Sequence, residues 1–74
     1  MAQLLDVRGL NCPLPLMRTR KALQTLPAGE VLEVQATDPM AAQEIPAFCK
    51  TGGYLLEKLE EKDGVFLFII RQPG

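Results

Sequence analysis

Hydrophobic and polar residues alternate along short stretches of the chain, a pattern typical of β-strands with one buried face. The clearest example is the stretch in which Leu32 and Val34 alternate with Glu33 and Gln35. The same pattern, together with the turn residues between stretches, predicts four strands. They cover Gln3–Arg8, Glu30–Thr37, Tyr54–Glu61 and Val65–Arg71.

The last two predicted strands form a hairpin, because Asp63-Gly64 between them is a strong signal for a two-residue turn. The final strand is apolar on both faces, as expected of a central strand with both faces largely covered. A layer of helices can cover only one face of a sheet. The other face is therefore open to a protein partner or a second subunit.

Two stretches show the helical spacing of apolar residues. The first runs from about Pro13 to Leu26 and the second covers about Pro39–Thr51. Thr37 and Asp38 precede the second helix and are interpreted as its cap rather than as a site. Pro46 should kink or divide that helix. The side chains expected to face the sheet are Leu16, Thr19, Ala22, Leu23, Leu26, Ile45, Phe48 and Cys49.

The order β-α-β-α-β-β predicts an α/β (α+β) fold, a two-layer sandwich in which a mixed four-stranded sheet carries both helices on one face. A chain of 74 residues suits one domain spanning residues 1–74. No stretch approaches the roughly 18 consecutive apolar residues of a membrane span. The N-terminus shows no signal-peptide pattern, and two cysteines are too few for a disulfide framework, so we expect a cytoplasmic protein.

The chain has no histidine, which excludes a Cys/His catalytic dyad and a four-ligand zinc site within one chain. Its net charge of −1 argues against a general nucleic-acid binder. The charges are unevenly placed, because no acidic residue lies between Asp6 and Glu30. The basic residues of this part are either an ordinary solvated face or a cationic surround for a reactive group that meets acidic partners. They are Arg8, Arg18, Arg20 and Lys21.

Cys12 is the candidate functional residue. It comes directly before Pro13 and close to Pro15, and both prolines can lie in the first turn of the helix. The N-terminus of a helix favours an anion, so we expect an exposed thiol with a lowered pKa. Arg8 is the nearest cation in sequence and is expected to support the thiolate, although it can also cap the strand or pair with Asp6.

The residues around Cys12 have supporting roles in this interpretation. Gly9 belongs to the turn that leads into the helix, where its conformational freedom is useful. The two prolines stiffen the segment that presents the thiol. A docking surface for partner proteins is expected on the first helix, formed by Leu14, Met17, Arg18 and Lys21.

The segment Asp6–Pro15 resembles the TusA/SirA family of sulfur-carrier proteins. The likeness extends over nearly the whole chain, through Thr37-Asp38-Pro39, Ile45–Cys49, Gly52-Gly53 and the final hairpin. Many relatives carry a histidine where this chain has Tyr54, which leaves any role of that histidine unsupported here.

This resemblance implies that Cys12 carries sulfur as a persulfide, with no other cofactor and no metal. The sulfur would come from a cysteine desulfurase or another sulfurtransferase and pass to a relay or acceptor protein. The routes in such families are thiolation of tRNA, synthesis of the molybdenum cofactor and sulfur oxidation. The protein would be a carrier rather than a stand-alone enzyme, a monomer or weak dimer, with no membrane partner.

Two other interpretations remain open from the sequence. A thiol redox protein would cycle between Cys12 and Cys49, which requires their Cα atoms to lie within about 7 Å. We favour a core position for Cys49. A regulatory or RNA-binding module is suggested by Arg18, Arg20 and Lys21 and by the similarity of the family's fold to the C-terminal domain of translation initiation factor three. Direct nucleic-acid binding is the weakest of the three.

Overall fold

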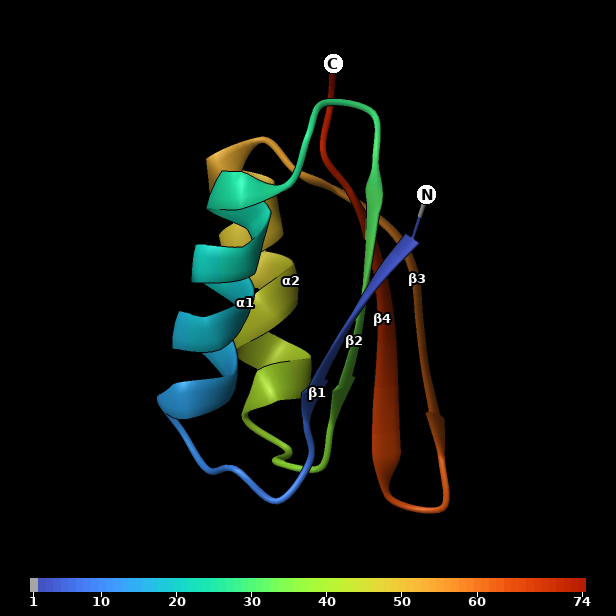
Figure 1. The fold of residues 1–74 in the computed structure, drawn as a ribbon. Helices are drawn as coiled ribbons and strands as arrows, with labels where there is room; N and C mark the ends of the chain where they lie inside the picture. The colour runs from blue at the N-terminus through green and yellow to red at the C-terminus, as the bar shows by residue number, and fades with distance from the viewer. Residues whose placement is uncertain (1) are drawn as a thin grey trace.

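A four-stranded mixed sheet with two helices on one face forms the fold of residues 2–74, the part of the chain described by the computed structural model (Figure 1). The predicted fold class and element order are confirmed, and each predicted boundary lies within two residues of the observed one. The elements are β1 (Ala2–Val7), α1 (Leu14–Thr25), β2 (Val31–Ala36), α2 (Ala41–Gly52), β3 (Leu55–Lys62) and β4 (Val65–Arg71).

The strands lie in the order β1-β2-β4-β3, so that β1 and β3 are the edges. β1 runs parallel to β2, with Val7 opposite Ala36, and the other neighbours are antiparallel. Because parallel strands end at the same side of the sheet, the loop after β1 and the loop after β2 lie next to each other, at the lower end of the molecule in Figure 1. This arrangement positions the candidate site.

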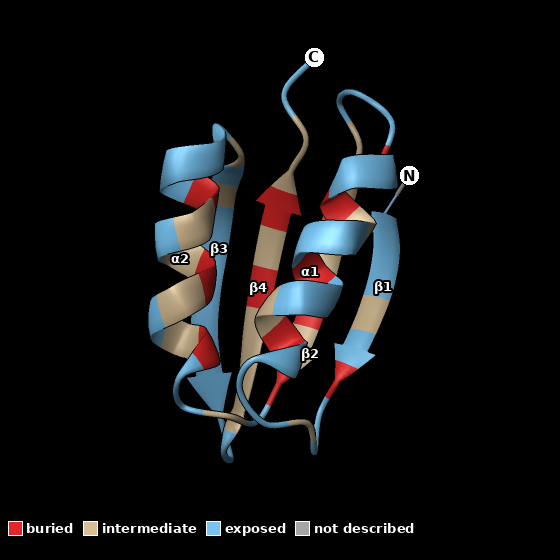
Figure 2. Cartoon of the chain, turned by 90° about the vertical axis from the view of Figure 1, so that its left-hand side faces the viewer, coloured by how far each residue is buried: buried red, intermediate tan, exposed pale blue. Residues whose placement is uncertain are grey.

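The core fills the space between the helices and the covered face of the sheet, and the buried residues follow the inner sides of α1, α2, β2 and β4 (Figure 2). Thr19, Leu23, Leu26, Ile45 and Cys49 are buried as predicted. Leu16, Ala22 and Phe48 are partly buried and pack against the core. The helix periodicity did not identify Pro15, which is also fully buried. The buried apolar residues are Val7, Leu23, Leu26, Leu32, Val34, Ala36, Ala41, Ile45, Cys49, Phe68 and Ile70.

The second helix starts later than predicted and is not divided by its proline. A turn comes first, in which the N–H of Ala41 donates to the carbonyl of Asp38 at 3.0 Å, and regular helix follows from Ala41. The helix continues through Pro46 to Gly52. Gly53 follows in the left-handed conformation, with φ of 80°, which a glycine adopts at little cost.

The hairpin turn has the expected geometry. Asp63 and Gly64 have φ values of 53° and 80°, and two positive φ angles are what a type I′ turn requires. β4 is central, but its Val65, Leu67 and Ile69 are only partly buried, because no helix covers that face of the sheet in residues 2–74.

Candidate functional site

Cys12 lies on the loop that joins β1 to α1. The loop begins with a turn in which the N–H of Leu10 donates to the carbonyl of Val7 at 3.2 Å, and Gly9 in that turn has a φ of +80°. A residue with a Cβ would be strained in that conformation, so glycine suits this position of the turn. Cys12 is exposed, as predicted, and forms no disulfide.

The start of α1 offers few N–H groups to an anion. Pro13 is the N-cap and Pro15 is the second residue of the helix, so neither position has an N–H. The N–H of Leu14 between them already donates to the carbonyl of Asn11 at 2.9 Å. The two prolines therefore stiffen this turn, and they also remove the donors that would stabilise a thiolate at the end of a helix.

Two side chains from the neighbouring loop hold the Cys12 loop in place. Oγ1 of Thr37 accepts a hydrogen bond from the N–H of Gly9 at 2.9 Å. Oδ2 of Asp38 accepts one from the N–H of Cys12 at 2.6 Å, while its Oδ1 accepts one from the N–H of Met40 at 3.1 Å. Asp38 therefore accepts a backbone N–H just before α2, as a cap residue does, and it also positions the Cys12 loop.

Glu44, in the first turn of α2, lies against the thiol. The Sγ atom of Cys12 is 3.5 Å from Oε1 and 3.8 Å from Oε2 of Glu44, and the S–H donates to this carboxylate. The hydrogen bond to Glu44 is the largest cause that raises the pKa of the Cys12 thiol above its ordinary value of 9.0. Partial desolvation and the negative charges of Glu44 and Asp38 raise it further. The lowered pKa expected from the sequence is therefore wrong.

Arg8 pairs with Asp6 instead of supporting the thiolate. Its Nε and Nη2 each lie 2.9 Å from an oxygen of Asp6, and its backbone N–H donates to Asp6 Oδ1 at 3.0 Å. This pairing lowers the pKa of Asp6 from 3.8 to about 2 and raises the pKa of Arg8. The two groups whose charges act on Cys12 are Glu44 and Asp38, so the site is acidic and not cationic.

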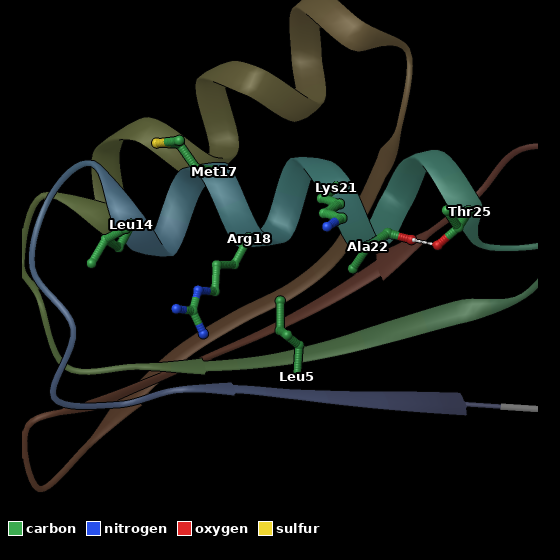
Figure 3. Close-up of a pocket in the computed structure, with 7 residues that line it drawn as sticks. All are labelled: Leu5, Leu14, Met17, Arg18, Lys21, Ala22 and Thr25. Carbon is green, nitrogen blue, oxygen red and sulfur yellow. Dashed lines mark hydrogen bonds between the residues drawn. The ribbon is translucent and has the colours of Figure 1, made fainter.

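The four predicted docking residues, by contrast, are brought together. Leu14, Met17, Arg18 and Lys21 line one groove of about 610 Å³ between α1 and the edge strand β1 (Figure 3). Leu5, Ala22 and Thr25 complete its wall. Leu14 is 40% exposed and Met17 is 57% exposed, which is unusual for two large apolar side chains on one helix turn. The groove begins at Leu14, two positions after Cys12.

Cys49 is separate from this site. Its side chain is 1% exposed inside the core, and burial raises the pKa of its thiol. Both cysteines are free. Tyr54 replaces the histidine that many relatives carry at this position. Its ring stacks on Phe48 with ring centres 5.5 Å apart, and both rings pack against the core.

Within residues 2–74 no cluster of three or more histidine, cysteine, aspartate or glutamate side chains is arranged to hold a metal ion. In the same part of the chain, neither helix has the length and apolar character needed to cross a membrane.

The model of the family described as sulfurtransferase TusA matches residues 3–72. The sulfur carrier protein TusA of Allochromatium vinosum is 44% identical over 70 residues, which cover 95% of this chain and 92% of that protein. The sulfur carrier protein TusA of Pseudomonas entomophila is 46% identical over 70 residues, covering 95% and 88%. A crystal structure of a SirA-like protein from Desulfitobacterium hafniense superposes with a TM-score of 0.82 at 31% identity, with both chains fully covered.

Proposed function

Because the chain belongs to the TusA family of sulfur carrier proteins, we propose that it carries sulfur as a persulfide on Cys12. The observation that supports this most directly is the position of the thiol. Cys12 is free and exposed on a loop that is held by hydrogen bonds to Thr37 and Asp38. An exposed sulfur on a firmly held loop can enter the active site of a partner, as a carrier requires.

Loading and delivery are both exchanges at sulfur and need no external oxidant. In loading, the Cys12 sulfur, as a thiolate, attacks the terminal sulfur of a persulfide on the donor. The sulfur–sulfur bond of the donor breaks, its cysteine leaves as a thiolate, and a new sulfur–sulfur bond forms on Cys12. In delivery, a nucleophile of the acceptor takes the terminal sulfur and Cys12 leaves as a thiolate. In each step one sulfur–sulfur bond breaks, one bond to the transferred sulfur forms and one thiolate leaves, so that no net oxidation or reduction takes place.

The carboxylate of Glu44 explains why such a carrier depends on its partners. It favours the protonated thiol in the free protein, because a thiolate would be repelled by Glu44 and by Asp38. The donor must therefore supply the base or the positive charge that activates Cys12. A resting thiol in this state is also a poor target for stray oxidants, which react with thiolates. In this proposal the protein acts as a carrier and not as a stand-alone enzyme, and the exchange at sulfur requires no resident cofactor.

The proposed donor is a cysteine desulfurase or another sulfurtransferase, and the proposed recipient is a relay or acceptor protein of tRNA thiolation, molybdenum-cofactor synthesis or sulfur oxidation. Exchange with such enzymes would take place in the cytoplasm. The groove lined by Leu14, Met17, Arg18 and Lys21 lies beside the thiol and is the proposed docking surface.

The test is an intact-mass measurement after incubation with a cysteine desulfurase and cysteine. The protein should gain about 32 Da, the mass of one sulfur atom, and lose it on reduction with dithiothreitol. Cys49→Ala serves as the matched control and should gain the same mass. Cys12→Ser should gain nothing. If Cys12→Ser still acquires the reducible sulfur, the assignment to Cys12 is wrong.

A further inference from the structure

β1 is an edge strand whose outer side is free. In the order β1-β2-β4-β3, β2 is its one neighbour among the described strands. One row of backbone N–H and C=O groups of β1 is therefore not used inside the sheet. Proteins commonly block such an edge with charged residues, above all lysine, with proline or with a bulge. β1 contains neither lysine nor proline, its one charged residue, Asp6, is paired with Arg8, and its pairing with β2 is regular over all six residues.

Apolar surface lies on both faces beside this edge. On the face toward the helices, Leu5 points from β1 toward α1 and forms one wall of the groove described above (Figure 3). On the opposite face of the same strand, Leu4 is 61% exposed. Successive side chains of a strand point to opposite faces. A strand added next to β1 would therefore place alternate side chains in the groove and beside Leu4.

The charge at the rim of the groove selects among the chains that could pair there. Arg18 extends from α1 toward β1, and Lys21 lies one turn further along the helix (Figure 3). Neither is in an ion pair within residues 2–74. A second copy paired through β1 would bring these cations close to those of its partner, which opposes such a dimer. An acidic chain would be attracted.

We propose that this groove binds an extended, acidic segment of a sulfur-transfer partner, which adds to the sheet as a strand beside β1. The proposal rests on the proposed function, because it takes the partner to be a donor or acceptor of the Cys12 sulfur. Main-chain hydrogen bonds to β1 supply affinity, and the alternating apolar side chains supply specificity. The groove starts at Leu14, so a segment bound along it holds the partner next to Cys12.

A synthetic peptide provides the test. The probe is an acetylated peptide of about eight residues, long enough for one strand. Valine and glutamate take turns along one of its faces and threonine fills the other, so that the face toward the groove carries both apolar and acidic side chains. Its binding to the full chain is followed by the shifts of backbone amide signals in two-dimensional NMR. The expected result is a set of shifts confined to β1 and the groove side of α1, with slower hydrogen exchange in β1. The affinity should fall with added salt.

Two protein variants and two modified peptides separate strand pairing from nonspecific electrostatic attraction. The double variant Arg18→Glu/Lys21→Glu should bind the peptide about tenfold more weakly, whereas Arg20→Glu, on α1 but outside the groove, should bind it nearly as well as the parent protein. A peptide with lysine in place of glutamate should not bind. An acidic peptide with methylated alternate amides should also fail, because it cannot donate the ladder hydrogen bonds.

The proposal is overturned if the acidic peptide causes no shifts up to about 1 mM, the weakest affinity that would matter here. It is also overturned if the methylated peptide binds equally well, if Arg20→Glu weakens binding as much as the double variant, or if an oligouridylate binds the groove better than the peptide. Binding should be unchanged in Cys12→Ser. The intact-mass test of sulfur loading uses no peptide, so that a failure of this groove and a failure of the sulfur-carrier role give different results.

Discussion

The backbone N–H of Cys12 donates a hydrogen bond of 2.6 Å to Oδ2 of Asp38, a residue 26 positions away in the sequence. The bond joins the loop that follows β1 to the loop that follows β2. Asp38 uses its other oxygen to accept the N–H of Met40 before α2. One carboxylate therefore fixes both the position of the thiol loop and the start of the second helix.

Replacing Asp38 by alanine should destabilise the protein by roughly 1–3 kcal/mol, because two backbone N–H groups lose a charged acceptor. Urea denaturation measures this change. Asp38→Asn keeps one oxygen acceptor and should cost less than Asp38→Ala. An Asp38→Ala protein as stable as the parent would mean that water replaces both hydrogen bonds at no cost.

Glu44→Gln should lower the pKa of the Cys12 thiol toward its ordinary value. The substitution weakens the acceptor of the S–H hydrogen bond, which is the largest cause of the raised pKa, and it also removes the negative charge of Glu44. More thiolate is then present at neutral pH, and alkylation of Cys12 by iodoacetamide should become several-fold faster. The measurement is the alkylation rate as a function of pH, made in a Cys49→Ala background so that one thiol is followed.

Glu60→Gln is the matched control for Glu44, since it makes the same change of charge on β3 and Glu60 is not among the groups that act on Cys12. Its alkylation profile should overlay that of the parent. If Glu44→Gln leaves the profile in place as well, the carboxylate does not control the thiol, and the explanation given for the carrier's dependence on its partners fails with it.

Sequence patterns were sufficient to predict the fold but not the chemistry of the site. Strand alternation, the helical spacing of apolar residues and the Asp63-Gly64 turn are local signals, and together they located every element. The contact between Glu44 and the thiol is a tertiary one, between the first turn of α2 and the loop before α1. No spacing along the chain encodes it. The contact between Asp38 and the Cys12 loop was more accessible to prediction. The carboxyl ends of parallel strands lie at the same edge of a sheet, so the loops that follow β1 and β2 are neighbours.

Arg8 shows why proximity in sequence was a poor guide to the charge around Cys12. Asp6 is two positions away from Arg8 and accepts three hydrogen bonds from it. The planar guanidinium of Arg8 binds both oxygens of the Asp6 carboxylate. This pairing holds the cation at the end of β1 instead of beside Cys12. Pro13 and Pro15 give a second example. They marked the start of the helix correctly, but the same residues lack the N–H groups from which a lowered thiol pKa was expected.

The pairing of Asp6 with Arg8 predicts a specific acid dependence of stability. The pKa of Asp6 is about 2 in the folded protein and 3.8 ordinarily, so its ionised form is favoured by folding. The ionised Asp6 therefore contributes to the stability of the folded protein above pH 3.8, and this contribution disappears as the pH falls through about 2. The parent should thus be more stable than Asp6→Asn at neutral pH, with the difference vanishing in strong acid. In Arg8→Met, the ¹³C signal of the Asp6 carboxyl should titrate nearer to pH 3.8. An Asp6 that titrates near 3.8 in the parent would contradict the pairing.

Thr19→Val should stabilise the protein. Thr19 is fully buried on the inner face of α1, and its Oγ1 has no hydrogen-bond partner within residues 2–74. Valine has nearly the same shape and no hydroxyl to desolvate, so we expect a gain of about 1 kcal/mol in the free energy of unfolding. Thr25→Val is the control, because Thr25 is exposed and donates to the carbonyl of Ala22 at 3.2 Å. It should show no such gain. A loss of stability in Thr19→Val would mean that the hydroxyl is bonded after all.

Cys49 should behave as a core residue and not as a redox partner of Cys12. At 1% exposure, and with its pKa raised by burial, it offers almost no thiolate to an oxidant or to a persulfide. In the native protein, dithionitrobenzoate should therefore modify Cys12 alone, and Cys49 should react only after unfolding in guanidinium. Cys49→Ala removes one sulfur from a packed core and should lower stability modestly, yet it should leave sulfur loading on Cys12 unchanged.

A redox cycle predicts the opposite pattern. Mild oxidation would join the two sulfurs within one chain, the product would lose both reactive thiols, and Cys49→Ala would abolish that change. Intact-mass analysis after treatment with diamide distinguishes the two, since an intramolecular disulfide lowers the mass by two hydrogens and blocks later alkylation at both positions.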